Sequence, residues 1–188
     1  MSYDVVDLRD FYAQRLGTVA RRFVGRGIRA RWSDTRGQRV LGVGYATPYL
    51  GLFREEAERC LAFMPAAQGV VKWPSARPTL TALVEELDLP LTDAAVDRAL
   101  LVHALEMSRD AEAMLREAWR VLAAGGRLLA VIPNRRGIWA RTDTTPFGHG
   151  RPYSRSQWQE DRGGRCAGDS GAVGRWRQHQ RHRAQPRL

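Results

Sequence analysis

Residues 39–50, Arg39-Val-Leu-Gly-Val-Gly-Tyr-Ala-Thr-Pro-Tyr-Leu50, decide the fold prediction for this chain. The apolar residues Val40, Leu41 and Val43 predict a strand, which breaks at Gly44 into small residues before a new amphipathic segment begins. This is the order of a strand, a tight turn and a helix start. Because the first N–H groups of a helix have no partner within it, such a turn offers donors and a positive dipole end to a ligand. The stretch therefore predicts a pocket for a nucleotide-type cofactor.

Strand and helix patterns alternate on both sides of this stretch. We expect helices at 5–24, 49–58 and 110–122, and strands at 39–43, 60–64, 81–84, 96–102 and 127–132. Gly25 and Gly27 are expected to end the first helix, and the pair Gly125-Gly126 the last one. Alternation over roughly 100 residues predicts an α/β fold with a doubly wound, mainly parallel sheet.

The ends of the predicted strands indicate where a ligand binds. In doubly wound sheets the ligand lies outside the carboxyl ends of the strands, near the switch point of the strand order. The residues that follow the strands are Gly44–Thr47, Met64-Pro65, Glu85-Glu86, His103–Glu106 and Pro133–Arg135. We therefore search these positions for the site.

Four motifs occur in the order and spacing of one known family. They are Val40–Ala46 as a glycine loop, Glu85–Leu91 as an acid followed by Leu-Pro, Asp97–Glu106 as the fourth strand and its turn, and Glu117–Leu122 with Gly125–Leu129 as a helix, glycine pair and fifth strand. Together they resemble the class I S-adenosylmethionine-dependent methyltransferases, in particular the small single-domain type 11-like enzymes related to quinone-biosynthesis methyltransferases. The resemblance covers about residues 35–157.

The resemblance implies S-adenosylmethionine as cofactor and methyl transfer to a small-molecule or lipid-like acceptor, which the sequence does not name. It places the cofactor against Gly44, Tyr45, Ala46, Met64, Glu85 and Glu86. His103 and His149 are candidates to face the substrate. The alternative for His103 is a packed, hydrogen-bonded histidine, and for His149 a plain loop residue. No residue is nominated as catalytic.

Two positions depart from the family pattern. The family usually has an acid in strand one that orients the methionine amino group, and Gly42 stands there. It also usually has an acid after strand two that accepts the ribose hydroxyls, where this chain reads Phe63-Met64-Pro65. Each missing charge-assisted hydrogen bond is worth roughly 1.5–3 kcal/mol, so we expect weaker cofactor binding unless other groups substitute.

The C-terminal part departs further. Residues 158–188 contain seven Arg, five Gly and four Gln, with Val173 and Leu188 as the only branched aliphatic residues. Such a segment buries too little apolar surface to offset its ordering entropy. We expect an N-terminal helical segment at 1–34, a methyltransferase-like domain at 35–157 and a disordered tail at 158–188, without the family's C-terminal antiparallel strand pair. We hypothesise that the tail is a frameshift product that impairs or abolishes activity, which translation of the other two frames past codon 157 tests.

Charge and cysteine content limit the remaining classes. The net charge of +10 is concentrated in residues 151–188, which hold nine Arg and three acids. One alternative is therefore a non-catalytic protein that binds nucleic acid through this basic tail, with Trp158 and Trp176 stacking on bases. Another is a nicotinamide-dependent Rossmann oxidoreductase, which the loop disfavours because it lacks the third glycine.

Compartment and metal content are also predicted. Two distant cysteines, Cys60 and Cys166, argue against a disulfide framework and predict a cytoplasmic protein. No apolar run reaches 18 residues, so no membrane span is expected. No metal site is expected either, because Cys166 lacks a second cysteine at short spacing.

Overall fold

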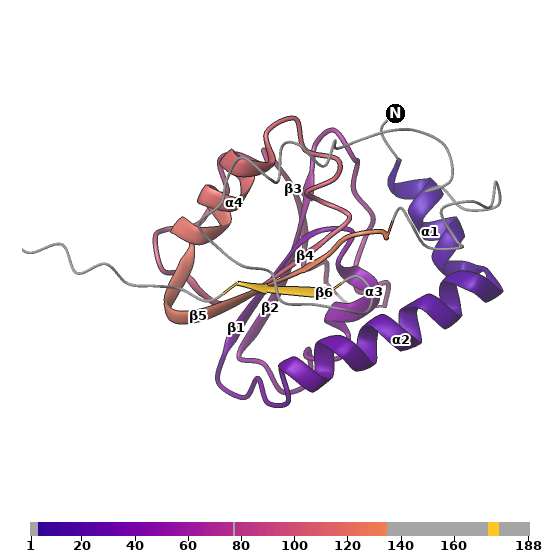
Figure 1. Cartoon of the computed structure of the whole chain (residues 1–188), viewed down its shortest axis with the longest axis horizontal. Helices are drawn as coiled ribbons and strands as arrows, with labels where there is room; N and C mark the ends of the chain where they lie inside the picture. Colours follow the sequence, from indigo (N-terminus) through magenta and orange to yellow (C-terminus); the bar gives the residue numbers. More distant parts are fainter. Residues whose placement is uncertain (1–3, 77, 135–172, 177–188) are drawn as a thin grey trace, which may run out of the picture.

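The computed structural model describes residues 4–76, 78–134 and 173–176. Figure 1 shows one twisted sheet with helices on both of its faces. Its strand order is β3-β2-β1-β4-β5-β6. The strands are β1 (Arg39–Gly44), β2 (Arg59–Pro65), β3 (Thr81–Val84), β4 (Val96–Val102), β5 (Leu122–Val131) and β6 (Val173–Trp176). Strands β1 to β5 run parallel, which confirms the predicted doubly wound sheet.

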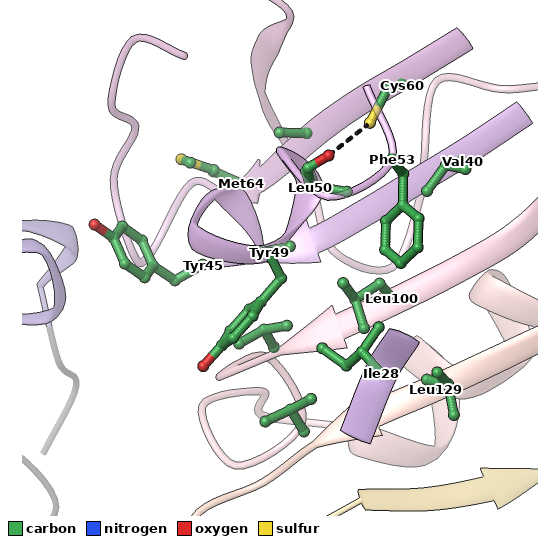
Figure 2. Packing of buried hydrophobic residues seen from close by; sticks show 14 of the residues in the cluster. Ile28, Val40, Tyr45, Tyr49, Leu50, Phe53, Cys60, Met64, Leu100 and Leu129 are labelled. Carbon is green, nitrogen blue, oxygen red and sulfur yellow. Dashed lines mark hydrogen bonds between the residues drawn. The ribbon is translucent and has the colours of Figure 1, made fainter. Parts of the chain in front are cut away.

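The sheet separates two apolar layers. Side chains of β4 alternate between them, because successive residues of a strand point to opposite faces. Leu100 and Val102 join the layer under the N-terminal helices, whereas Ala99 and Leu101 join the layer under the C-terminal helix. All four are buried, as expected for a central strand covered on both faces. Figure 2 shows the first layer, in which Ile28 reaches the sheet beside Leu100.

The N-terminal helix prediction needs correction. Two helices, α1 (Val5–Ala13) and α2 (Arg15–Arg31), replace the single helix expected at 5–24, and Gln14 between them has extended backbone angles. A side chain at Gly17 would place its Cβ 2.0 Å from the carbonyl oxygen of Phe11, so the tight junction requires glycine. Gly25 and Gly27 do not end α2. Burial of Ile28 carries the helix past them, because packing of an apolar face outweighs low intrinsic propensity.

The helix expected at 49–58 is also wrong. Helix α3 spans only Thr47–Leu50, and turns follow it up to residue 56. Phe53 lies in these turns and is fully buried, and Cys60 donates to the Leu50 carbonyl (Figure 2). The chain therefore folds back onto the core directly after α3.

The last helix is confirmed, with different limits. Helix α4 (Ala111–Arg120) is N-capped by Asp110, whose carboxylate accepts from the Ala113 N–H at 2.9 Å. The pair Gly125-Gly126 does not end it, because β5 has already begun at Leu122. Gly125 instead has a φ of +76° within the strand, before β5 enters the core at Leu128.

Strand β6 lies beyond the predicted strands, in the C-terminal part of the chain. It lies inside the segment 158–188, which was expected to have no regular structure, and pairs antiparallel with β5. Its backbone groups satisfy the open edge of β5, a gain that does not depend on hydrophobic periodicity. Among the residues described, one antiparallel strand follows β5 rather than a pair.

Candidate functional site

The loop after β1 is held against the end of β4. Gly44 has a φ of +78°, and a Cβ there would lie 2.4 Å from the Val102 carbonyl oxygen. The next N–H, from Tyr45, donates to the same oxygen at 2.8 Å. Only glycine combines this backbone conformation with this close approach. The glycine predicted for the loop is therefore required by the fold, and it fixes the loop at the carboxyl edge of the sheet.

The surroundings of Gly42 explain why β1 lacks the acid that the family usually has in its first strand. A Cβ at this position would lie 2.6 Å from the Ala46 Cβ and 2.7 Å from Leu50 Cδ1. The space that a carboxylate would need is thus filled by the loop and by α3. Any compensating acid has to come from another element.

A buried polar network lies at the same edge. The Tyr12 hydroxyl, from α1, is 3.0 Å from the Tyr49 hydroxyl of α3 and 2.9 Å from His103 Nε2 after β4. The other ring nitrogen, Nδ1, is 2.8 Å from Glu106 Oε1. The side chains of His103 and Glu106 are each 5% exposed. Side chains from α1 and α3 therefore join the histidine after β4 in one network.

The His103 tautomer sets the direction of these hydrogen bonds. In the neutral tautomer that donates from Nδ1–H to the Glu106 carboxylate, Nε2 accepts from the Tyr12 hydroxyl. Tyr12 then accepts from Tyr49. Burial raises the pKa of Tyr12 well above its usual value, and burial likewise raises the pKa of Tyr49 to about 12. Both phenols are therefore protonated at neutral pH and able to donate.

The backbone at His103 is strained. Its φ is +50°, a conformation that costs a non-glycine residue roughly 1–2 kcal/mol. The Gln68 side chain, from the loop after β2, donates to the His103 carbonyl at 2.9 Å and holds this conformation. Strain of this kind persists only where surrounding contacts impose it, and it concentrates at functional sites.

Two buried oxygens of this cluster have no hydrogen-bond partner among the described residues. They are Gln68 Oε1 and Glu106 Oε2. Gln68 is 3% exposed and Glu106 8%. A buried acceptor without a partner is costly, and a ligand that carries N–H or O–H groups would remove that cost. The arrangement suits a ligand with donors, such as an ammonium group or hydroxyls.

The other predicted residues are distributed as follows. Tyr45 and Ala46 are buried in the loop, and Tyr45 stacks on Tyr12 with ring centroids 5.7 Å apart. Met64 is fully buried at the end of β2, where its Sδ accepts from the Val71 N–H, and Figure 2 shows it in the apolar layer near α3. His149 lies outside the described residues.

The two predicted acids after β3 differ in their surroundings. Glu85 is exposed. Glu86 accepts from the Ser108 hydroxyl at 2.6 Å, which joins the ends of β3 and β4. The structure thus brings His103 together with the loop after β1, whereas Glu86 pairs with Ser108.

Three residues of the network, Tyr12, Tyr49 and Gln68, were missed from the sequence. Tyr12 and Tyr49 were assigned to amphipathic helices, where aromatic residues usually denote core. Glu106 lay among the positions expected after β4, and the same signal, a polar residue shortly after a strand, could have identified Gln68 after β2. No sequence signal identifies Tyr12, because it reaches the site from outside the alternating pattern.

A separate cavity lies at the opposite edge of the sheet. It has a volume of about 420 Å³ and lies at the amino ends of β1, β2 and β4, where Arg39 and Arg59 line it. The buried histidine network and the strained loop are at the carboxyl edge. We therefore place the functional site at the carboxyl edge.

The described residues contain neither a membrane-spanning helix nor a metal cluster. None of the described helices is both long and apolar enough to cross a bilayer. No three His, Cys, Asp or Glu side chains among them gather as metal ligands.

Comparison with known families agrees with this geometry. A family model described as a methyltransferase domain matches residues 24–130, more than half of the chain. The chain therefore belongs to this family, the class I S-adenosylmethionine-dependent methyltransferases. The match decides against the nicotinamide-dependent alternative. No curated protein matches the chain.

Solved structures show the same fold. A SAM-dependent methyltransferase from Archaeoglobus fulgidus matches with a TM-score of 0.56 and 16% identity, over 74% of this chain and 66% of that one. Another from Aquifex aeolicus matches with a TM-score of 0.55 and 16% identity, over 80% and 88% of the two chains. The chain spans only half the length of the YcgJ protein from Bacillus subtilis, which it matches at 23% identity over 58% of its own residues with a TM-score of 0.49. At identities this low, the matches show only that the fold is shared.

Proposed function

We propose that this protein transfers a methyl group from S-adenosylmethionine to an acceptor hydroxyl. The observation that carries the proposal is the chain of hydrogen bonds from Glu106 through His103 to a hydroxyl at Nε2. A carboxylate behind a histidine orients the ring and stabilises the imidazolium that forms when the ring takes a proton. The Tyr12 hydroxyl occupies the position from which an acceptor hydroxyl would give up its proton.

The residues present fit the cofactor. The loop Gly44–Ala46 supplies a close backbone approach, and Glu106 Oε2 and Gln68 Oε1 are buried acceptors with unused capacity. These two oxygens would replace the acids that Gly42 and the end of β2 lack. Met64, Glu85 and Glu86 remain proposed cofactor contacts. When bound, S-adenosylmethionine supplies an electrophilic methyl group on a positively charged sulfur.

The chain's own residues then have defined tasks. His103 Nε2 takes the proton of the acceptor hydroxyl, and Glu106 compensates the charge of the resulting imidazolium. The strained backbone and Gln68 hold the ring in place, so that positioning contributes to the rate. Because Tyr12 occupies Nε2 in this structure, α1 must shift for an acceptor to reach the ring.

The wider assignments are part of the same proposal. We divide the chain into a helical segment at 1–34, a methyltransferase domain at 35–157 and a basic tail at 158–188. The acceptor is a small or lipid-like molecule, and the protein acts in the cytoplasm. His149, which lies outside the described residues, stays a predicted substrate contact. Binding of nucleic acid is assigned to the basic tail alone.

Calorimetric titration tests the cofactor. We expect S-adenosylmethionine and S-adenosylhomocysteine to bind to the full chain and NAD not to bind. Absence of binding by both sulfur nucleotides would contradict the proposal.

A histidine variant tests the base. His103→Asn keeps a residue type that tolerates positive φ and retains an amide for hydrogen bonding. We expect S-adenosylmethionine affinity within about threefold of wild type, but a loss of about 10²–10⁴-fold in release of S-adenosylhomocysteine with a panel of phenols and alcohols. Equal release by variant and wild type would exclude His103 as the base without touching the cofactor assignment.

A further inference from the structure

Helix α2 exposes one unusual face. At about 100° per residue, Arg15, Val19, Arg22, Phe23 and Arg26 fall within about 100° of arc. These five residues, called here the arginine face, are exposed to solvent. Figure 1 shows α2 along the rim of the molecule, with α3 and the sheet on one side of it. The side that carries Gly25 and Ile28 packs on the core, so the arginine face points outward.

The charge of this face is not neutralised. Helix α2 carries six arginines and no acidic residue. Arg29 pairs with Glu56 from the turns after α3. Within the part of the chain that the structure describes, Arg15, Arg22 and Arg26 form no ion pair. Three unpaired guanidinium groups along one side of a helix attract an anionic surface.

Two apolar side chains lie among these arginines. Phe23 is 66% exposed, the highest value among the large apolar residues that the structure describes, and Val19 one turn earlier is 42% exposed. Arg26 lies 6.0 Å from the centre of the Phe23 ring. A phosphodiester backbone would pair with the arginines but leave Val19 in water. A lipid surface accommodates both kinds of side chain, because apolar side chains enter the acyl boundary while arginines reach the headgroups.

Charge disfavours two other occupants. Residues 151–188 of this chain carry nine arginines and three acids, so charge disfavours them as the occupant of the arginine face, although β6 within this segment lies next to α2. A second copy related by a two-fold axis would place arginines against arginines. The occupant must be anionic and apolar.

We propose that the arginine face docks on an anionic lipid surface. This inference is independent of the proposed function. Helix α2 follows α1 directly, and α1 carries Tyr12 into the histidine network. Docking would therefore set the end of the molecule that carries α1 close to the membrane surface.

Cosedimentation with vesicles tests the proposal on the full chain. We expect binding to vesicles of equal parts phosphatidylcholine and phosphatidylglycerol, and none to phosphatidylcholine alone. The triple variant Arg15→Gln, Arg22→Gln, Arg26→Gln should lower the partition coefficient roughly 100-fold, at about fivefold per arginine. Phe23→Ser should lower it about tenfold, because the burial of one aromatic ring is lost.

A charge-matched variant provides the control. Arg36→Gln, Arg59→Gln, Arg109→Gln removes the same charge from exposed positions outside α2 and should stay within about threefold of wild type. Equal loss in both triple variants would overturn the proposal, since net charge alone would then explain binding. It would also be overturned if wild type ignored anionic vesicles but bound an RNA duplex through the same three arginines. All variants should keep the wild-type circular dichroism, because the replaced side chains make no core contact.

Discussion

The two edges of the sheet hold polar side-chain pairs that differ in their exposure to water. At the amino edge, Arg39 binds Asp97 through its backbone N–H at 2.8 Å and its guanidinium at 3.1 and 3.3 Å. These side chains are 39% and 29% exposed. At the carboxyl edge, His103 and Glu106 are 5% exposed each. The amino-edge pair joins β1 to β4 in contact with water, whereas the carboxyl-edge pair is sealed from it.

The difference indicates what each edge is for. A solvent-exposed ion pair contributes little to the free energy of unfolding, so breaking it costs little stability. A buried pair with an oxygen left over costs stability, and the fold retains it beside a strained backbone. A positive φ also occurs at the amino edge, at Ala94 (+56°), so burial of the polar pair, rather than strain alone, marks the carboxyl edge as the reactive one.

The largest expected effect concerns Glu106. Glu106→Gln should lower methyl transfer by about 10²–10⁴-fold, because an amide can hold the wrong ring tautomer. Nitrogen NMR of His103 should show the change of tautomer without need of an acceptor. Glu112→Gln, in an exposed pair on α4, is the control and should leave both readouts unchanged. An unchanged tautomer would contradict the role assigned to Glu106 at the carboxyl edge.

Gly44 should give the next largest effect. Gly44→Ala should lower the free energy of unfolding by about 3 kcal/mol, because it combines a positive φ with a Cβ 2.4 Å from a backbone oxygen. Gly37→Ala is matched in φ, at +65°, but meets nothing within 4 Å and should cost about 1 kcal/mol. Urea denaturation measures both. Equal losses would show that close packing against β4 contributes nothing.

Tyr12 sharpens the comparison within the network. Tyr12→Phe should cost about 1–2 kcal/mol, since it leaves both the Tyr49 hydroxyl and His103 Nε2 without this partner. Tyr49→Phe removes only the outer hydroxyl and should cost about half as much. The same denaturation experiment ranks them, and the reverse order would contradict the central position of Tyr12 between Tyr49 and His103.

The amino-edge pair should show the smallest effect, and it depends on pH. Burial opposes ionisation of Asp97, but the hydrogen bonds and charge of Arg39 outweigh it and hold the pKa below the ordinary value. A carboxylate with a lowered pKa stabilises the fold above its unfolded pKa of about 3.9, and this contribution disappears as pH falls through the folded pKa. The stability difference between wild type and Asp97→Asn should therefore be constant near neutral pH and shrink in acid. A difference that grew in acid would reverse the sign of the shift.

The sequence predicted the sheet well because strands buried on both faces are continuous apolar runs. Strand β4 was predicted at its observed limits, 96–102. The helices were predicted less well. Helix α2 passes through two glycines because Ile28 and Trp32 are buried, which only packing decides. Strand β6 was missed because edge pairing uses backbone groups rather than side-chain periodicity.

The site was predicted in part for a similar reason. The loop Gly44–Ala46 and His103 were predicted because they follow strands directly. The role of Gly42 could not be predicted from the sequence, since the atoms that exclude an acid belong to Ala46 and Leu50. Tyr12 lies 91 positions from its partner His103, and no local pattern spans that distance.

Sequence alone determined the positions of the strands along the chain, the glycine turn and hence the family, because strand burial and positive φ leave local signatures. Tertiary structure alone decided which polar groups meet. The histidine network joins α1, α3 and the ends of β2 and β4, elements that are brought together by packing of the two apolar layers. A hydrogen bond depends on distances of a few tenths of an ångström, and such distances are set only when the whole sheet has formed.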